Sequence, residues 1–151
     1  MGSIFFSILN WSEVWALFIP LSVLIIKRNQ PVYMRPIALY LLLAPLLNLT
    51  CDILTTYNDA HLHHKISNNP IYNIHSIIRF ICFSYFFIVK QKSFKRINQL
   101  ITIVYFLFVA INFFFFEKFF YTQNISGNLL SMEAFLLLTY CMLYYLSQLK
   151  N

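Results

Sequence analysis

The segment NNPIYNIHSIIRF at residues 68–80 decides the fold of this chain. Pro70 suits the first turn of a helix, and the apolar residues that follow predict a membrane-spanning helix. At about 100° per residue, four polar side chains of this helix fall within one stripe: Tyr72, His75, Ser76 and Arg79. A guanidinium in hydrocarbon is costly, so Arg79 should face a protein partner or a watery cavity.

The composition extends this prediction to the whole chain. Of 151 residues, 60% are hydrophobic and only 11% are charged, far from the roughly one quarter that is usual in soluble domains. Five apolar segments are long enough to cross a hydrocarbon core of about 30 Å. We therefore predict one all-α integral membrane bundle over residues 1–151, whose five transmembrane helices span residues 4–26, 36–57, 70–89, 97–116 and 128–149.

The distribution of basic residues predicts the orientation of the bundle. The first and third loops and the C-terminus hold most of them: Lys27, Arg28, Arg35, Lys90, Lys92, Lys95, Arg96 and Lys150. The second and fourth loops hold only Lys65 and Lys118. Lys and Arg gather on the cytoplasmic side, which places the N-terminus outside and the C-terminus inside. The first helix begins near either Ile4 or Ser12.

Polar residues of several spans are expected at one height in the outer leaflet. Counted from the helix ends, Asp52 and Arg79 lie about 7 and 12 Å deep, and His75, Asn112 and Glu133 lie nearby. We expect Arg79 to pair with Asp52, Glu133 or both, while His75 and Asn112 supply further hydrogen bonds. Such a network either only fixes helix packing or forms a polar pocket that opens outward and binds a small ligand, an ion or a lipid headgroup. A proton relay is a further reading.

The second loop contains candidate metal ligands, namely Asp59, His61, His63 and His64. Carboxylate and imidazole groups suit zinc and similar ions. A histidine-rich loop is more typical of a solvated surface, because no helical HxxxH or HExxH frame orients these rings. The sequence identifies no cofactor. The formal net charge of +6 does not indicate a nucleic-acid partner, because the basic residues are confined to short loops.

Three parts of the sequence carry a resemblance to a known group of proteins: the Asn69–His75 run, the 111–114 stretch INFF, and the 131–133 stretch SME, with a basic loop between the first two. In these parts the chain resembles small polytopic inner-membrane proteins of Bacteroidota that have no established activity. Those proteins usually have about seven spans and often an acidic residue near the position of Arg79. The resemblance implies that a second copy or another membrane subunit closes the open side of a five-span bundle.

Together these observations lead to one expected function and two alternatives. We expect a non-enzymatic binding or accessory subunit of an inner-membrane complex, in contact with the lipid bilayer and with other membrane subunits or copies of itself. One alternative is a membrane-embedded hydrolase that uses Glu133, Asp52 and histidines in metal-assisted or acid–base chemistry. The other is a small oligomeric channel or transporter.

Overall fold

Helix α4 (Asn69–Lys90) is the central element of the fold. It starts within the 68–80 segment, as the sequence predicts. The computed structural model describes residues 12–27, 29–60, 68–119 and 126–149. Pro70 stands in the first turn of α4, where its missing N–H group leaves no hydrogen bond unmade. The buried residues of α4 recur mostly every three or four positions along the helix: Asn73, Ser76, Phe80, Cys82, Ser84 and Phe87. This spacing gives α4 a continuous face that packs against its neighbours.

The other helices are joined by short connections. They are α2 (Ser12–Ile26), α3 (Arg35–Ala60), α5 (Lys95–Ile111) and α6 (Gly127–Leu149). Short 3-10 turns, Val32–Met34 and Lys92–Phe94, lead into α3 and α5. The last turn after α5, Asn112–Phe116, is wound as a π-helix. Ser126 caps α6, since its hydroxyl accepts a hydrogen bond from the Leu129 backbone N–H at 3.1 Å.

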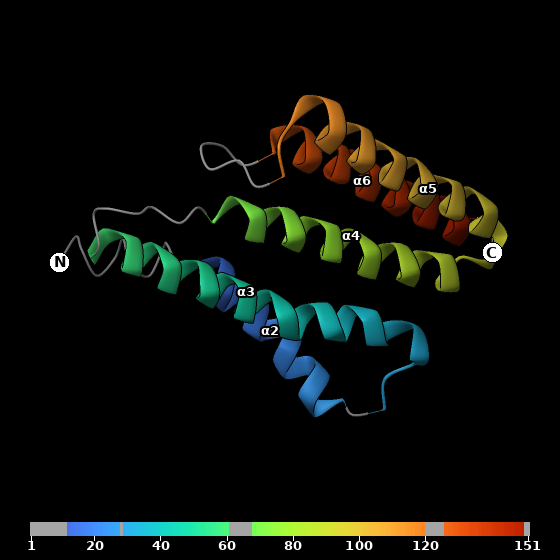
Figure 1. The fold of residues 1–151 in the computed structure, drawn as a ribbon. Helices are drawn as coiled ribbons and strands as arrows, with labels where there is room; N and C mark the ends of the chain where they lie inside the picture. Colours follow the sequence, from blue (N-terminus) through green and yellow to red (C-terminus); the bar gives the residue numbers. More distant parts are fainter. Residues whose placement is uncertain (1–11, 28, 61–67, 120–125, 150–151) are drawn as a thin grey trace.

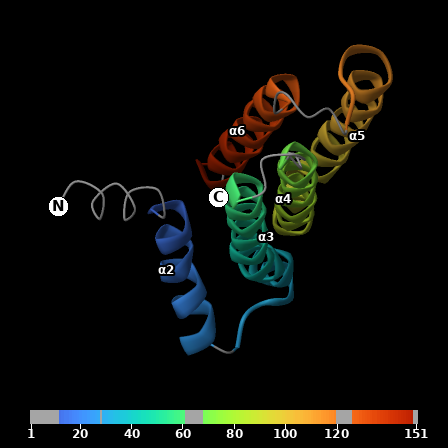
Figure 2. The ribbon, with the colours of Figure 1, turned by 60° about the vertical axis from the view of Figure 1, so that its left-hand side comes forward.

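The helices pack on two sides of α4. Helix α3 lies on one side, and α5 and α6 together lie on the other (Figure 1). Figure 2 shows the same order from another direction, with α2 resting on α3. Helices α3 and α6 do not pack extensively against each other in the described part of the chain. Helices α3 and α6 therefore both lie beside one flank of α4, but they do not cover it by packing extensively against each other.

The main core lies between α4, α5 and α6 and is largely aromatic. Its buried members are Phe80, Phe87, Tyr105, Leu129, Leu136 and Tyr140. The rings of Phe80 and Tyr105 stack with centroids 3.7 Å apart, and those of Phe87 and Tyr140 stack at 5.2 Å. Since lipid tails are as apolar as these side chains, close packing holds the helices together more than exclusion from water does.

A hydrogen-bond network ties the core to the α4–α5 connection. Asn98 is fully buried and donates to the Gln91 side-chain oxygen at 2.8 Å and to the Phe87 carbonyl at 3.2 Å. The Tyr140 hydroxyl donates to the Asn98 carbonyl at 3.0 Å and is 2.8 Å from the Thr102 hydroxyl. Buried polar groups in a membrane protein need such partners, so this network fixes α6 against α5.

We predict that Tyr140→Phe lowers the free energy of unfolding in detergent by about 1 kcal/mol, within the range measured for hydrogen bonds between membrane helices. The ring stays in the core while the bonds to Asn98 and Thr102 are lost. Tyr145→Phe is the matched control, because Tyr145 is 64% exposed. Equal effects of the two substitutions, measured by thermal unfolding of the purified proteins, would contradict the role of this network.

The all-helical prediction is confirmed in the described residues. Four segments are long and apolar enough to cross a membrane: Val32–Tyr57, Asn69–Lys90, Lys92–Phe116 and Gly127–Leu149. They correspond to the last four predicted spans and indicate a multi-pass membrane protein. The predicted first span is represented by α2, a shorter apolar helix, and its residues 4–11 lie outside the described part of the chain. The start of the first helix and the orientation of the bundle stay predictions.

Candidate functional site

Arg79 and Glu133 form a two-pronged ion pair between α4 and α6. The Arg79 Nε atom lies 2.5 Å from Glu133 Oε1, and Arg79 Nη2 lies 2.8 Å from Oε2. The buried Ser76 hydroxyl donates a third hydrogen bond to Oε2. Glu133 is completely buried, so a lone carboxylate at this place would be costly, and these three donors offset that cost. We call Ser76, Arg79 and Glu133 the ion-pair centre.

Helical spacing explains why these side chains meet. Ser76 and Arg79 are three residues apart and therefore lie on adjacent parts of one face of α4. Glu133 lies on the buried face of α6 with Leu129, Leu136 and Tyr140, at intervals of three or four residues. The ion-pair centre is thus built into the same interface as the aromatic core.

Two tyrosines complete the surroundings of the ion-pair centre. Tyr105 of α5 is fully buried, and its hydroxyl faces Ser76 and Glu133 without forming a hydrogen bond of regular geometry among the described residues. Tyr40 of α3 interacts with Arg79 through its hydroxyl. The sequence analysis missed both. A signal was present, because a tyrosine in the middle of a span needs a partner for its hydroxyl when buried.

Arg79 is the member of the ion-pair centre that reaches the surface. Its contacts with Tyr40 and Glu133 place the guanidinium between α3 and α6, on the flank of α4 that those helices do not close. The Arg79 side chain is 34% exposed, whereas Glu133 is 0% exposed. Glu133 accepts two of the five guanidinium N–H groups, so three remain for Tyr40 and for another acceptor.

The other predicted residues of the α4 stripe turn toward α3. The His75 ring stacks on the Tyr40 ring with centroids 5.6 Å apart. Tyr72 is 37% exposed and interacts with Cys51 of α3. The structure thus brings His75 close to the ion-pair centre through Tyr40 and leaves Tyr72 nearer the end of the bundle.

Of the two acidic partners expected for Arg79, the structure shows Glu133, while Asp52 and Asn112 lie outside the ion-pair centre. Among the described residues, Arg79 forms its ion pair with Glu133, and Asp52 is exposed on α3. Depth along a helix does not tell which way a side chain faces: Asp52 is exposed, whereas its neighbour Cys51 is buried. Asn112 instead donates to Glu117 at 2.9 Å and accepts from Asn128 at 3.3 Å, where it ties the π-helical turn to the start of α6.

The predicted metal ligands cannot be placed as a group. His61, His63 and His64 and the side chain of Asp59 lie outside the described residues. Within the described part of the chain, no three His, Cys, Asp or Glu side chains come together in a way that suits a metal ion. The metal site in the second loop stays a prediction.

Comparisons of the chain with protein-family models, with curated proteins and with solved structures found no match. We therefore infer function from the contacts, burial and charge of the ion-pair centre.

Proposed function

We propose that this multi-pass membrane protein is a non-enzymatic accessory subunit, and that Arg79 binds a hydrogen-bond acceptor on a neighbouring membrane protein. The observation that carries the proposal is the contrast between the two ends of one ion pair. Glu133 is fully buried and held by Arg79 and Ser76, whereas Arg79 is one-third exposed with N–H groups to spare. A preorganised, partly exposed guanidinium is well suited to bind a carboxylate or carbonyl group.

The same geometry favours binding over catalysis. Glu133, a catalytic candidate in the alternative hydrolase hypothesis, already accepts hydrogen bonds from Arg79 and Ser76 and has no exposed surface. A general base needs reach to the group it deprotonates, and Glu133 has none in this arrangement.

The position of Arg79 supports a protein partner within the membrane. Helix α3, which supplies Tyr40, also exposes apolar side chains such as Leu39 and Leu42, which can pack against another helix. The resemblance to seven-span proteins fits this proposal, because it implies additional helices beside a five-span bundle. We place the complex in a bacterial inner membrane with the N-terminus outside, as the distribution of Lys and Arg indicates.

Site-specific photocrosslinking in native membranes tests this proposal. A photoreactive residue at position 39 should give one discrete crosslinked protein product, since Leu39 is 54% exposed and directly precedes Tyr40 on α3. The same residue at position 115 is the control, because Phe115 is 80% exposed on the π-helical turn and far along the chain from Arg79.

A second set of variants separates binding from folding. The double variant Arg79→Met/Glu133→Met should stay folded, because it removes both charges together, but should lose the position-39 product. Arg79→Lys should keep part of the product, since the charge remains while the paired N–H geometry is lost. An undiminished product in the folded double variant, or lipid adducts alone at position 39, would overturn the proposal.

A further inference from the structure

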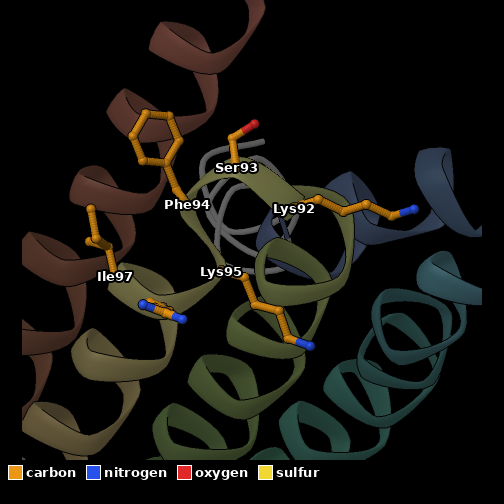
Figure 3. A pocket seen from close by; sticks show the side chains of 6 residues that line it. Lys92, Ser93, Phe94, Lys95 and Ile97 are labelled. Atoms are coloured by element: carbon orange, nitrogen blue, oxygen red, sulfur yellow. The ribbon is translucent and has the colours of Figure 1, made fainter.

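The connection between α4 and α5 forms a shallow basic depression that the ion-pair centre does not use. It has a volume of about 290 Å³ and is lined by Lys92, Ser93, Phe94, Lys95, Arg96 and Ile97. In Figure 3 the aliphatic chains of Lys92 and Lys95 extend to one side of the connection, while Phe94 and Ile97 lie on the side of α6. The depression thus combines cationic groups with an apolar wall.

The charges at this depression are not neutralised within the described part of the chain. The ion pair found there is Arg79–Glu133, so Lys92, Lys95 and Arg96 have no carboxylate partner among those residues. The acidic residues stand elsewhere in the sequence: Glu13, Asp52, Asp59, Glu117 and Glu133. Three like charges within five consecutive residues repel one another, and an anion bound beside them relieves that repulsion.

Neighbouring elements add to the positive charge of this end of the bundle. Figure 1 shows the start of α3, the end of α4 and the start of α5 at the same end. Arg35 begins α3, and Lys90 ends α4 with its Nζ atom 4.7 Å from the centroid of the Tyr33 ring. The ends of membrane-spanning helices lie at the level of the lipid headgroups, which places the depression beside lipid phosphates.

We infer that the depression at residues 92–97 is a binding site for the phosphodiester headgroup of an anionic phospholipid. Lys92, Lys95 and Arg96 contact the phosphate, and Phe94 and Ile97 contact the glycerol and the first part of the acyl chains. The occupant is a lipid and not a soluble anion, because the apolar wall adjoins the membrane-spanning part of α5. Orientation in the membrane requires only that cations lie on one side. It does not require a depression in which cations stand next to an apolar wall, and a lipid-binding site does combine these two features.

Lipid titration of the purified full-length protein in detergent tests the inference, with native mass spectrometry as the readout. Phosphatidylglycerol should bind more tightly than phosphatidylcholine of the same chain length. Lys92→Gln/Lys95→Gln/Arg96→Gln should weaken phosphatidylglycerol binding by about tenfold or more, since each cation near a lipid surface contributes substantially. Lys92→Arg/Lys95→Arg/Arg96→Lys should keep the preference.

The matched control removes the same number of charges outside the depression. Lys27→Gln/Lys65→Gln/Lys118→Gln should change phosphatidylglycerol affinity by less than about threefold, because these residues are not among those that line the site. Raised salt should weaken phosphatidylglycerol binding to the unaltered protein and leave phosphatidylcholine binding unchanged, a test that needs no variant. Equal affinity for the two lipids, an equal loss in the control, or displacement by inorganic phosphate at the lipid's own concentration would overturn the inference.

Discussion

Arg79→Met is expected to lower the free energy of unfolding by about 3–5 kcal/mol, which is the usual cost of removing one partner from a buried ion pair. The substitution leaves Glu133 completely buried with the Ser76 hydroxyl as its remaining donor from the ion-pair centre. Buried Cys82 on α4 provides a readout, because a thiol reagent reaches it only when the helices open. The labelling rate should rise by about two to four orders of magnitude, at about 1.4 kcal/mol per factor of ten, in a background where Cys51 and Cys141 are serine.

The double variant Arg79→Met/Glu133→Met is the control for this prediction. Replacing both members of a buried ion pair with apolar side chains is often neutral or stabilising, so the double variant should label far more slowly than Arg79→Met. The two single variants and the double variant complete a double-mutant cycle that isolates the pairwise energy. A double variant as unstable as Arg79→Met would show that Glu133 is not what makes the loss of Arg79 costly.

Phe80→Ala should destabilise the bundle by about 3 kcal/mol, at the lower end of the range for truncating a buried phenylalanine. Phe80 has no exposed surface and stacks on Tyr105, so alanine leaves a cavity between α4 and α5. The cost arises from lost packing contacts, which hold helices together in lipid. The Cys82 labelling rate reports this change too, since Cys82 is two residues away on the same helix.

Phe115→Ala is the matched control for Phe80→Ala. Phe115 is 80% exposed, and its truncation should change the free energy of unfolding by less than about 0.5 kcal/mol, as is usual for surface substitutions. Xenon or benzene, which fill apolar cavities, should slow Cys82 labelling in Phe80→Ala and leave Phe115→Ala unchanged. Equal labelling rates in the two variants would mean that the stacked Phe80–Tyr105 pair does not hold α4 against α5.

The helices could be predicted from the sequence because their signals are local. Pro70, the apolar runs and the short basic loops mark the last four spans to within two residues of the observed limits when the π-helical turn is counted with α5, apart from the end of α3, which lies three residues beyond the predicted span. The π-helical turn Asn112–Phe116 was not foreseen. It depends on contacts between Asn112 and residues of the following loop and helix, which the apolar pattern around it does not show.

The ion-pair centre could be predicted only in part. Arg79 needed an acidic partner in the membrane, and the sequence offered Asp52 and Glu133 at similar expected depth. The choice depends on how each helix is rotated about its axis, because rotation turns Glu133 into the α4–α6 interface and Asp52 out of the α3–α4 interface. The rotation of a helix about its axis is set by packing against its neighbours. The sequences of α3 and α6 indicate only weakly which face packs, because apolar residues occur all around both helices.

The separation of Arg79 and Glu133 along the chain has a consequence during synthesis. The two residues are 54 positions apart, so at about 5–20 residues per second the ribosome needs roughly 3–10 s to produce the carboxylate after the guanidinium. Helix α4 enters the membrane during that interval with its cation still unmatched. We expect Arg79 to stay near the headgroups or within the insertion machinery until α6 arrives, so that the arrival of α6 fixes the final depth of α4.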